Sequence, residues 1–97
     1  MTKGGWVYIM ADRYRGAMYI GVTAYLASRI MQHRSGKGSD FCKRYGLIRL
    51  VYAEPHDDIR SAIAREKAMK KWNRAWKIQL IEKQNPDWLD LFKMLNA

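Results

Sequence analysis

The sequence has one cysteine, two prolines and half as many acidic as basic residues. The single cysteine, Cys42, cannot form an internal disulfide, and no Cys-x-x-Cys pair indicates a zinc site. No apolar run is long enough for a signal peptide or a membrane span. These absences predict a cytoplasmic protein in a reducing compartment.

The shortage of acidic residues leaves a strong positive charge. Eighteen Lys and Arg stand against nine Asp and Glu, a net charge of +9. Such a charge on a small domain attracts polyanions, so nucleic acid is the favoured partner, ahead of an anionic membrane surface. A basic protein with no anionic ligand is the remaining alternative. At 97 residues the chain supports one hydrophobic core, so we expect a single domain over residues 1–97.

The first third of the chain predicts a hairpin and a helix. Trp6 to Met10 and Met18 to Val22 are rich in bulky, β-favouring residues, and the polar loop between them suits two antiparallel strands. Thr23 is a candidate N-cap for the helix that follows. Alternation places Trp6, Tyr8 and Met10 on one face of the first strand, and Tyr19 and Gly21 on one face of the second. Helical spacing places Leu26, Arg29, Ile30 and His33 on one side of the helix.

The rest of the chain predicts one more strand and further helix. Leu47 to Ala53 has the composition of a third strand, which Pro55 would close. Asp57 or Asp58 would cap one long helix ended by Asn85-Pro86, and residues 88–95 form another amphipathic turn or helix. The apolar positions of the long helix are Ile59, Ala62, Ile63, Met69, Trp72, Trp76 and Leu80. The order β-β-α-β-α-α is that of a small α/β or α+β sandwich.

Glu66 interrupts the apolar stripe of the long helix, three residues after Ile63 and three before Met69. A carboxylate on a core-facing stripe is costly unless it is paired or binds a cation. An ion pair with Arg29 or a nearby lysine and a metal-ligand role are both consistent with this pattern.

Arg29 and His33 lie at i and i+4 on the inward side of their helix. Arginine grips phosphate through two parallel hydrogen bonds and stays charged. Histidine exchanges a proton near neutral pH. The alternatives are an arginine that reaches the surface and a histidine satisfied at the edge of the core.

The spacing of Trp6-Val7-Tyr8 and Tyr19-Ile20-Gly21, followed by Arg29, His33 and Glu66, resembles the GIY-YIG nuclease superfamily. The likeness is greatest to stand-alone, single-domain bacterial members related to the N-terminal nuclease domain of the excision-repair subunit UvrC, and it extends through Lys70-Lys71-Trp72 to Asn85-Pro86-Asp87-Trp88. Trp6 and Val7 differ from the glycine and isoleucine of the family motif, but both suit a strand.

The resemblance implies an α+β fold, a three-stranded antiparallel sheet flanked by helices, and metal-dependent hydrolysis of phosphodiesters. It implies one Mg²⁺ or Mn²⁺ ion held by Glu66, which agrees with the scarcity of converging carboxylates. Tyr8 would be the general base or the residue that orients water, and as a base it would need a nearby cation or a proton acceptor such as His33. The roles of Tyr8 and Tyr19 could be exchanged. Tyr19 would position the water or the phosphate, and Arg29 would clamp the phosphate.

Other functional residues follow less directly. The family often has a late asparagine near the metal, for which Asn85 and Asn73 are candidates. Trp72 or Trp76 could stack on a base, although core packing is the commoner role of such residues. The expected phosphate contacts are Lys37, Lys43, Arg44, Lys67, Lys70, Lys71, Arg74 and Lys77.

The functional expectation is a DNA endonuclease that acts alone or with a targeting protein. Repair, recombination and defence against foreign DNA all remain open as settings. The alternatives are a nucleic-acid-binding module that keeps the fold without turnover, and an adaptor whose tail at residues 88–95 docks a partner helix.

Overall fold

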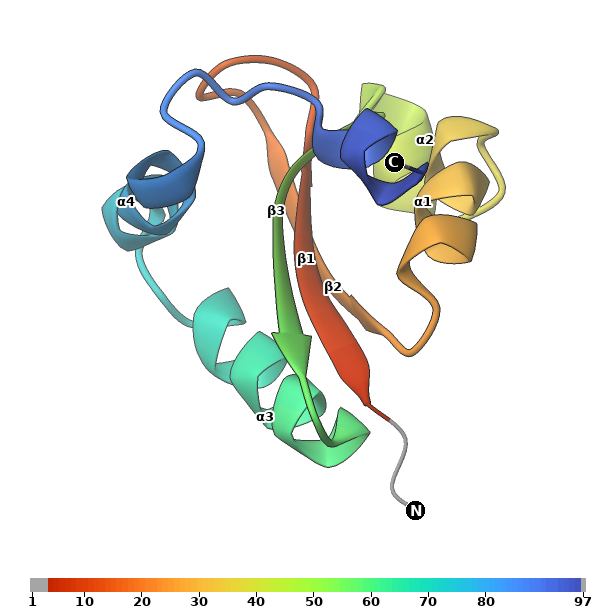
Figure 1. The fold of residues 1–97 in the computed structure, drawn as a ribbon. Helices are drawn as coiled ribbons and strands as arrows, with labels where there is room; N and C mark the ends of the chain where they lie inside the picture. Colours follow the sequence, from red (N-terminus) through yellow and green to blue (C-terminus); the bar gives the residue numbers. More distant parts are fainter. Residues whose placement is uncertain (1–3, 97) are drawn as a thin grey trace.

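A computed structural model describes residues 4–96 as one sheet with helices on both faces (Figure 1). The sheet is antiparallel and three-stranded, with the order β2-β1-β3. It confirms the predicted α+β class. In chain order the elements are β1 (Gly5–Ala11), β2 (Met18–Thr23), α1 (Leu26–Arg34), α2 (Asp40–Tyr45), β3 (Arg49–His56), α3 (Ile59–Lys70), α4 (Arg74–Gln84) and the 3₁₀ helix η1 (Leu91–Asn96). Within the described residues, no helix is both long and apolar enough to cross a bilayer.

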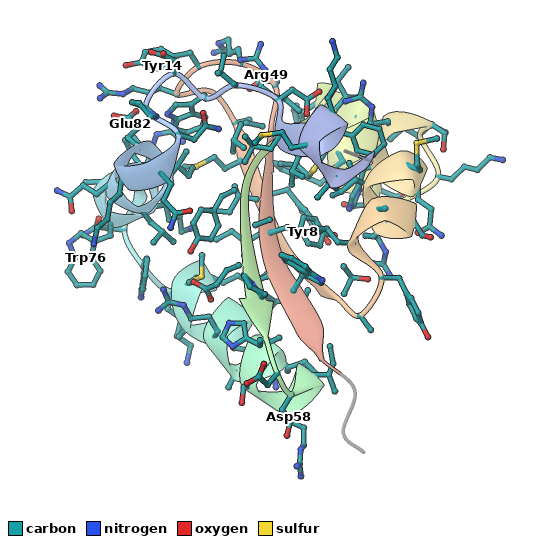
Figure 2. The ribbon with its side chains drawn as sticks, in the orientation of Figure 1. Tyr8, Tyr14, Arg49, Asp58, Trp76 and Glu82 are labelled. Atoms are coloured by element: carbon teal, nitrogen blue, oxygen red, sulfur yellow. The ribbon has the colours of Figure 1, made fainter. Side chains whose placement is uncertain are left out.

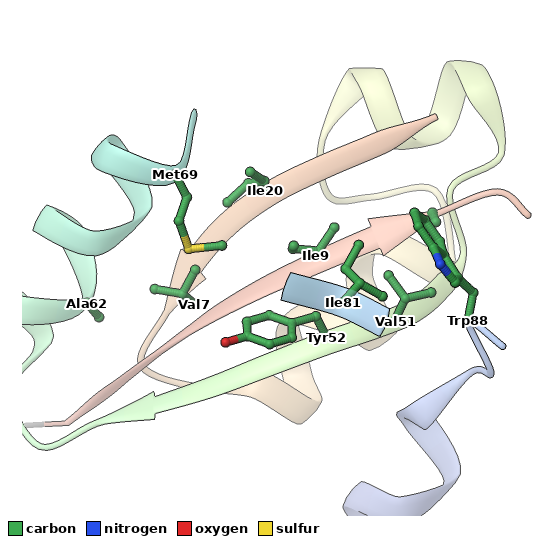
Figure 3. Packing of buried hydrophobic residues seen from close by; sticks show 10 residues of the cluster. Val7, Ile9, Ile20, Val51, Tyr52, Ala62, Met69, Ile81 and Trp88 are labelled. Atoms are coloured by element: carbon green, nitrogen blue, oxygen red, sulfur yellow. The ribbon is translucent and has the colours of Figure 1, made fainter. Parts of the chain in front are cut away.

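Two hydrophobic cores lie on opposite faces of the sheet. One joins the sheet to α3 and α4 and centres on Ile9, Met69, Ile81 and Trp88 (Figure 3). The other lies under α1, α2 and η1, which gather on the opposite side in Figure 1. Its buried members are Tyr8, Met10, Leu26, Ile30, Cys42, Leu47 and Leu50.

The strand alternation predicts these faces correctly. Tyr8 and Met10 are fully buried on the α1 side, while Trp6 and Tyr19 pack against the same core from partly buried positions. In the register of the hairpin, Tyr8 lies opposite Gly21 and Met10 opposite Tyr19. Because β1 is the central strand, Tyr8 is covered from both sides, whereas Tyr19 lies on an edge strand.

Three element boundaries differ from the sequence prediction. The predicted long helix is two helices, because the Asn73 side chain accepts a hydrogen bond from the Trp76 amide and starts α4 anew. The third strand continues through Pro55 to His56, which its edge position permits. The short helix α2 is absent from the prediction; Ser39 caps its start, and Gly46 ends it in the left-handed conformation at φ 67°.

The predicted helix caps are partly correct. Asp58 caps α3 by accepting from the Arg60 amide, as predicted for Asp57 or Asp58. Thr23 is not the N-cap of α1; its hydroxyl accepts from the amide of Tyr25, which itself holds the cap position without a side-chain cap bond. Ile63, placed on the apolar stripe of α3, is 38% exposed and lies outside the core.

Candidate active site

A buried tyrosine–histidine pair occupies the centre of the site. The Tyr8 hydroxyl and the His33 Nε2 atom are 2.7 Å apart, and both side chains are buried. Tyr8 points from β1 toward α1 (Figure 2), and His33 faces it from the last turn of that helix. The i, i+4 spacing of Arg29 and His33 therefore does bring His33 to a motif tyrosine.

Gly21 makes room for the Tyr8 ring. A Cβ atom built on Gly21 would clash with Cζ and the hydroxyl oxygen of Tyr8. The ring of Tyr8 thus lies across the neighbouring strand at the point where that strand has no side chain. This contact gives a physical reason for glycine at the third position of the Tyr19-Ile20-Gly21 motif.

The segment before α2 holds the other side of the His33 ring. The Ser39 amide donates to His33 Nδ1 at 3.4 Å, and a Cβ atom on Gly38 would clash with the same nitrogen. A neutral histidine that accepts at Nδ1 carries its proton on Nε2. The Ser39 contact thus favours the tautomer in which His33 Nε2–H donates to the Tyr8 oxygen over the one in which Nε2 accepts the Tyr8 proton.

Tyr19 and Arg29 complete the surroundings of the pair. The Tyr19 ring centre lies 6.3 Å from that of Tyr8 and 5.4 Å from that of His33. Burial, and next the neighbouring Tyr19, raise the pKa of Tyr8 above its ordinary value, while the Arg29 guanidinium acts against this rise. Burial and then the charge of Arg29 lower the pKa of His33. Tyr8 is a phenol and His33 is neutral at pH 7.

Tyr19 and Arg29 also open the site to solvent. Arg29 lines a pocket of about 160 Å³ on α1. Tyr19 lines another of about 200 Å³ at the β2 edge, where Lys70 of α3 and Lys77 of α4 also contribute.

Glu66, on the helix that covers the sheet face opposite to that of Tyr8, is linked to this second pocket through Lys70. The Glu66 Oε1 atom pairs with the Lys70 Nζ atom at 3.4 Å, and the Glu66 side chain is only 14% exposed. Of the two sequence alternatives, the ion pair is therefore formed, with Lys70 and not with Arg29. Since α3 packs on β1 and β2, Glu66 lies one helical turn from a residue that shares a pocket with Tyr19.

The residues present are compatible with one divalent cation. Within residues 4–96 no group of three His, Cys, Asp or Glu side chains is placed to hold a metal ion. A protein site of many ligands is thus not formed. A lone carboxylate such as Glu66, completed by water and substrate phosphate, matches the way Mg²⁺ is commonly bound.

The two asparagines have structural roles away from the tyrosines. Asn85 is buried on the other side of the sheet, where its amide donates to the carbonyls of Val51 and Leu89 and accepts from the Leu89 amide. Asn73 caps α4. These hydrogen bonds give both residues a structural role, and a metal-ligand role for either one stays a prediction.

Five of the expected phosphate-binding residues lie on α2, at the end of α3 and at the start of α4. Lys43 and Arg44 are exposed on α2. Lys70 and Lys71 lie at the end of α3. Arg74 is exposed but engaged, since its Nη2 atom donates to the carbonyls of Arg15 and Gly16 and joins α4 to the hairpin loop.

Sequence reasoning missed three residues around the central pair. Gly38, Ser39 and Phe41 lie between the predicted first helix and the predicted third strand, where the sequence predicts no element. Gly21, by contrast, is on a predicted face with Tyr19, and the antiparallel pairing places it opposite Tyr8. The sequence gives a weaker indication of α2, because Ser39-Asp40 is a possible helix start and Gly46 a possible helix end.

Comparison with known proteins places these residues in a family. Residues 4–79 match the GIY-YIG catalytic domain. A UPF0213 protein of Syntrophus aciditrophicus is 38% identical over 88 residues, covering 90% of this chain and 98% of that protein. A UPF0213 protein of Bacillus cereus is 31% identical over 86 residues, covering 89% and 90% of the two chains.

A third relative, a UPF0213 protein of Clostridium perfringens, is 35% identical over 80 residues, covering 82% of this chain and 85% of that protein. No solved structure matches significantly. The family match spans both tyrosines, Arg29, His33 and Glu66, and the sheet has the topology that the motif implies. The chain belongs to the GIY-YIG family of nuclease domains.

Proposed function

We propose that this protein is a metal-dependent endonuclease that hydrolyses phosphodiester bonds in DNA. The buried 2.7 Å contact between Tyr8 and His33 carries the proposal. Buried titratable groups with shifted pKa values and a specific polar partner cluster at functional sites, and this pair has both properties. Two glycines, Gly21 and Gly38, leave the space for it.

Tyr8 is proposed to orient the attacking water. It rests as a phenol because burial raises its pKa, and His33 already donates to its oxygen. The proton of Tyr8 is then directed to another partner, the water or the substrate. A phenol that keeps its proton cannot take one from water, so a base role would require Tyr8 first to lose its own proton to solvent. Arg29 is the described residue whose charge favours the resulting phenolate.

Arg29 and Tyr19 are proposed to hold the substrate. The planar guanidinium of Arg29 is suited to a non-bridging phosphate oxygen, and its pocket on α1 gives access from solvent. Tyr19 forms the wall between Tyr8 and the pocket at the β2 edge, where it can position the phosphate or the water.

Glu66 is the carboxylate that would hold the Mg²⁺ or Mn²⁺ ion, whose charge stabilises the negative charge that develops on the phosphate and leaving oxygen. Glu66 must first part from Lys70, since the two are paired. Exposed as Lys70 is, at 51%, the pair is weak. A released Lys70 gains the substrate phosphate as a new partner.

The alternative is a nucleic-acid-binding module that keeps the fold without turnover. The Glu66–Lys70 pair favours it, because a lysine neutralises the only carboxylate that the motif supplies. A net charge of +9 serves either function.

Nicking of supercoiled plasmid with Mg²⁺ or Mn²⁺ tests the proposal. Tyr8→Phe should slow nicking by about 100-fold or more, the usual contribution of a positioned acid–base group, and Glu66→Gln should abolish it. Tyr52→Phe and Glu82→Gln are matched controls, since both residues bond elsewhere: Tyr52 to Glu54, and Glu82 to Arg15 and Trp88. The nuclease proposal fails if the wild type cuts neither plasmid, branched DNA nor RNA, or if Tyr8→Phe and Glu66→Gln cut at the wild-type rate. The non-catalytic nucleic-acid-binding module is then the favoured function.

A further inference from the structure

A run of aromatic rings leads from the buried centre to the surface. Tyr19, next to Tyr8, is stacked on Phe41 with ring centres 6.5 Å apart and 28° between the planes. Phe41 in turn lies 4.8 Å from Tyr45. Phe41 is 43% exposed and Tyr45 is 53% exposed, and both belong to α2. Neither ring is a member of the two cores, and both present much of their area to solvent.

Phe41 faces the pocket at the β2 edge, in which aromatic and cationic groups meet. Tyr19 and Phe41 line it together with Lys70 of α3 and Lys77 of α4, and Met18 and Ile20 of β2 complete the lining. The pocket is therefore bounded by aromatic and apolar side chains and by two lysines. Its volume of about 200 Å³ is below the roughly 300–1,000 Å³ of sites that enclose whole ligands, which suits a single planar ring.

Cationic groups continue along α2 beyond this pocket. The Arg44 guanidinium lies 5.8 Å from the centre of the Tyr45 ring, and Lys43 is exposed on the same helix. Interleaved rings and cations are typical of surfaces that bind unpaired nucleotides, where the cations follow the phosphates and the bases stack on the rings. A nucleic acid is the partner that supplies both a polyanionic chain and flat apolar faces.

The exposed ring face favours an unpaired base over a paired one. In a duplex, both faces of each base are covered by its neighbours, so a protein ring can stack only on a base that is unpaired or turned out of the helix. We propose that Phe41, backed by Tyr45, is a stacking site for one unpaired nucleobase beside the phosphate to be cleaved. The proposal rests on the nuclease function proposed above and identifies its substrate as a strand with an accessible base.

Fluorescence anisotropy in EDTA measures binding without cleavage and tests this site. The probes are a single-stranded oligonucleotide, the same strand with abasic positions, its perfect duplex, and a duplex with one bulged base. Phe41→Leu keeps apolar bulk without the ring, and Phe41→Trp restores a ring. Ile48→Ala is the matched control, because Ile48 is 49% exposed and lines none of the described pockets.

Phe41→Leu should weaken single-strand binding by about 5- to 100-fold, the range given by stacking of one base on an aromatic side chain. Its effect on the perfect duplex and on the abasic strand should stay within about twofold, because neither presents a base face. Phe41→Trp and Ile48→Ala should bind like the wild type. The slope of log affinity against log salt should not change with Phe41→Leu, since that slope counts phosphate contacts. If Phe41→Leu weakens binding to the bulged duplex as much as binding to the single strand, a base turned out of a duplex is also a ligand of this site.

Other results would overturn the proposal. Phe41→Leu could lower the affinity for single strand and duplex equally, lower neither affinity, or reduce the slope of log affinity against log salt. A wild type that binds none of the probes would also overturn the proposal. A failure of Phe41→Trp to restore binding would point to packing on Tyr19 as the role of Phe41. A wild type that binds through Phe41 but never cleaves would refute only the nuclease function. A wild type that cleaves DNA while Phe41→Leu binds the single strand with unchanged affinity would refute only the stacking site.

Discussion

Replacing Gly21 by alanine tests the central packing of the site. The new Cβ would overlap Cζ and the hydroxyl oxygen of Tyr8, and the Tyr8 ring is fully buried, so it has nowhere to withdraw. Overpacking of this kind costs about 1–3 kcal/mol. Alanine recovers about 0.4–1 kcal/mol by restricting the unfolded chain, which leaves a net loss of about 1–2 kcal/mol. For a domain of this size the melting temperature should fall by roughly 5–15 °C.

The effect on cleavage should exceed the effect on folding. The displaced hydroxyl must leave its 2.7 Å contact with His33, and a shift of about 1 Å at a reacting group can lower the rate about 100-fold. Urea denaturation gives the stability, with an unchanged m-value expected, and plasmid nicking at a temperature where the variant is folded gives the rate.

The control is the same substitution in a Tyr8→Leu background. There the ring is gone, so Gly21→Ala should no longer destabilise the fold, and the two changes should be strongly coupled. If Gly21→Ala costs the same in both backgrounds, or leaves the wild-type melting temperature and nicking rate unchanged, the Tyr8–Gly21 contact does not organise the site.

Three further results are expected. Ser39→Pro removes the amide that donates to His33, and proline tolerates the φ of −80° at this position. Nitrogen NMR should show that the Nε2–H form of His33 dominates in the wild type and in Ser39→Ala, and that the two tautomers are mixed in Ser39→Pro. A mixture in the wild type would refute the tautomer assignment. Burial and Arg29 lower the pKa of His33 in the folded state, so protonation favours the unfolded chain. The free energy of unfolding should therefore fall as the pH drops below about 6.5. In a plot of urea midpoint against pH, His33→Gln should flatten this part of the curve. Asn85→Ala should lower the free energy of unfolding by about 1–3 kcal/mol, since buried carbonyls lose their donor. It should leave metal-dependent nicking by the folded protein unchanged, and a selective loss of nicking would instead support Asn85 as a metal ligand.

The strands and the inward face of α1 could be predicted because their patterns are strong. Alternation around Tyr8 and the i, i+4 spacing of Arg29 and His33 each reflect one buried face, and burial is what sequence periodicity reports. The antiparallel pairing of two short strands then brings Tyr8, Tyr19 and Gly21 together with little freedom.

The helical part was harder to predict for identifiable reasons. Trp72 and Trp76 keep an i, i+4 spacing across the break at Asn73, so the apolar pattern continues although the helix does not. Helix α2 has one buried residue, Cys42, and no periodicity to detect. Pro55 indicated a strand end, but the chain order alone could not show that β3 is an edge strand.

Asn85 illustrates a limit of motif reasoning. A late asparagine satisfies a pattern by type and order, but the side chain is held by the turn that contains Trp88, which is at φ 56° and fully buried. Whether an amide faces a metal or ties a turn depends on tertiary contacts that the sequence does not display.

The position of the candidate pocket on an edge strand bears on the solubility of the protein. Among the described residues, no strand pairs with the outer backbone of β2, and such an edge can recruit a strand from a second molecule. Lys70 and Lys77 stand over this edge, and lysines at an edge discourage that pairing by charge repulsion. The cations that would attract a polyanion thus also keep copies of the chain apart, so neutralising them should promote self-association, and bound nucleic acid should replace their protection by covering the edge.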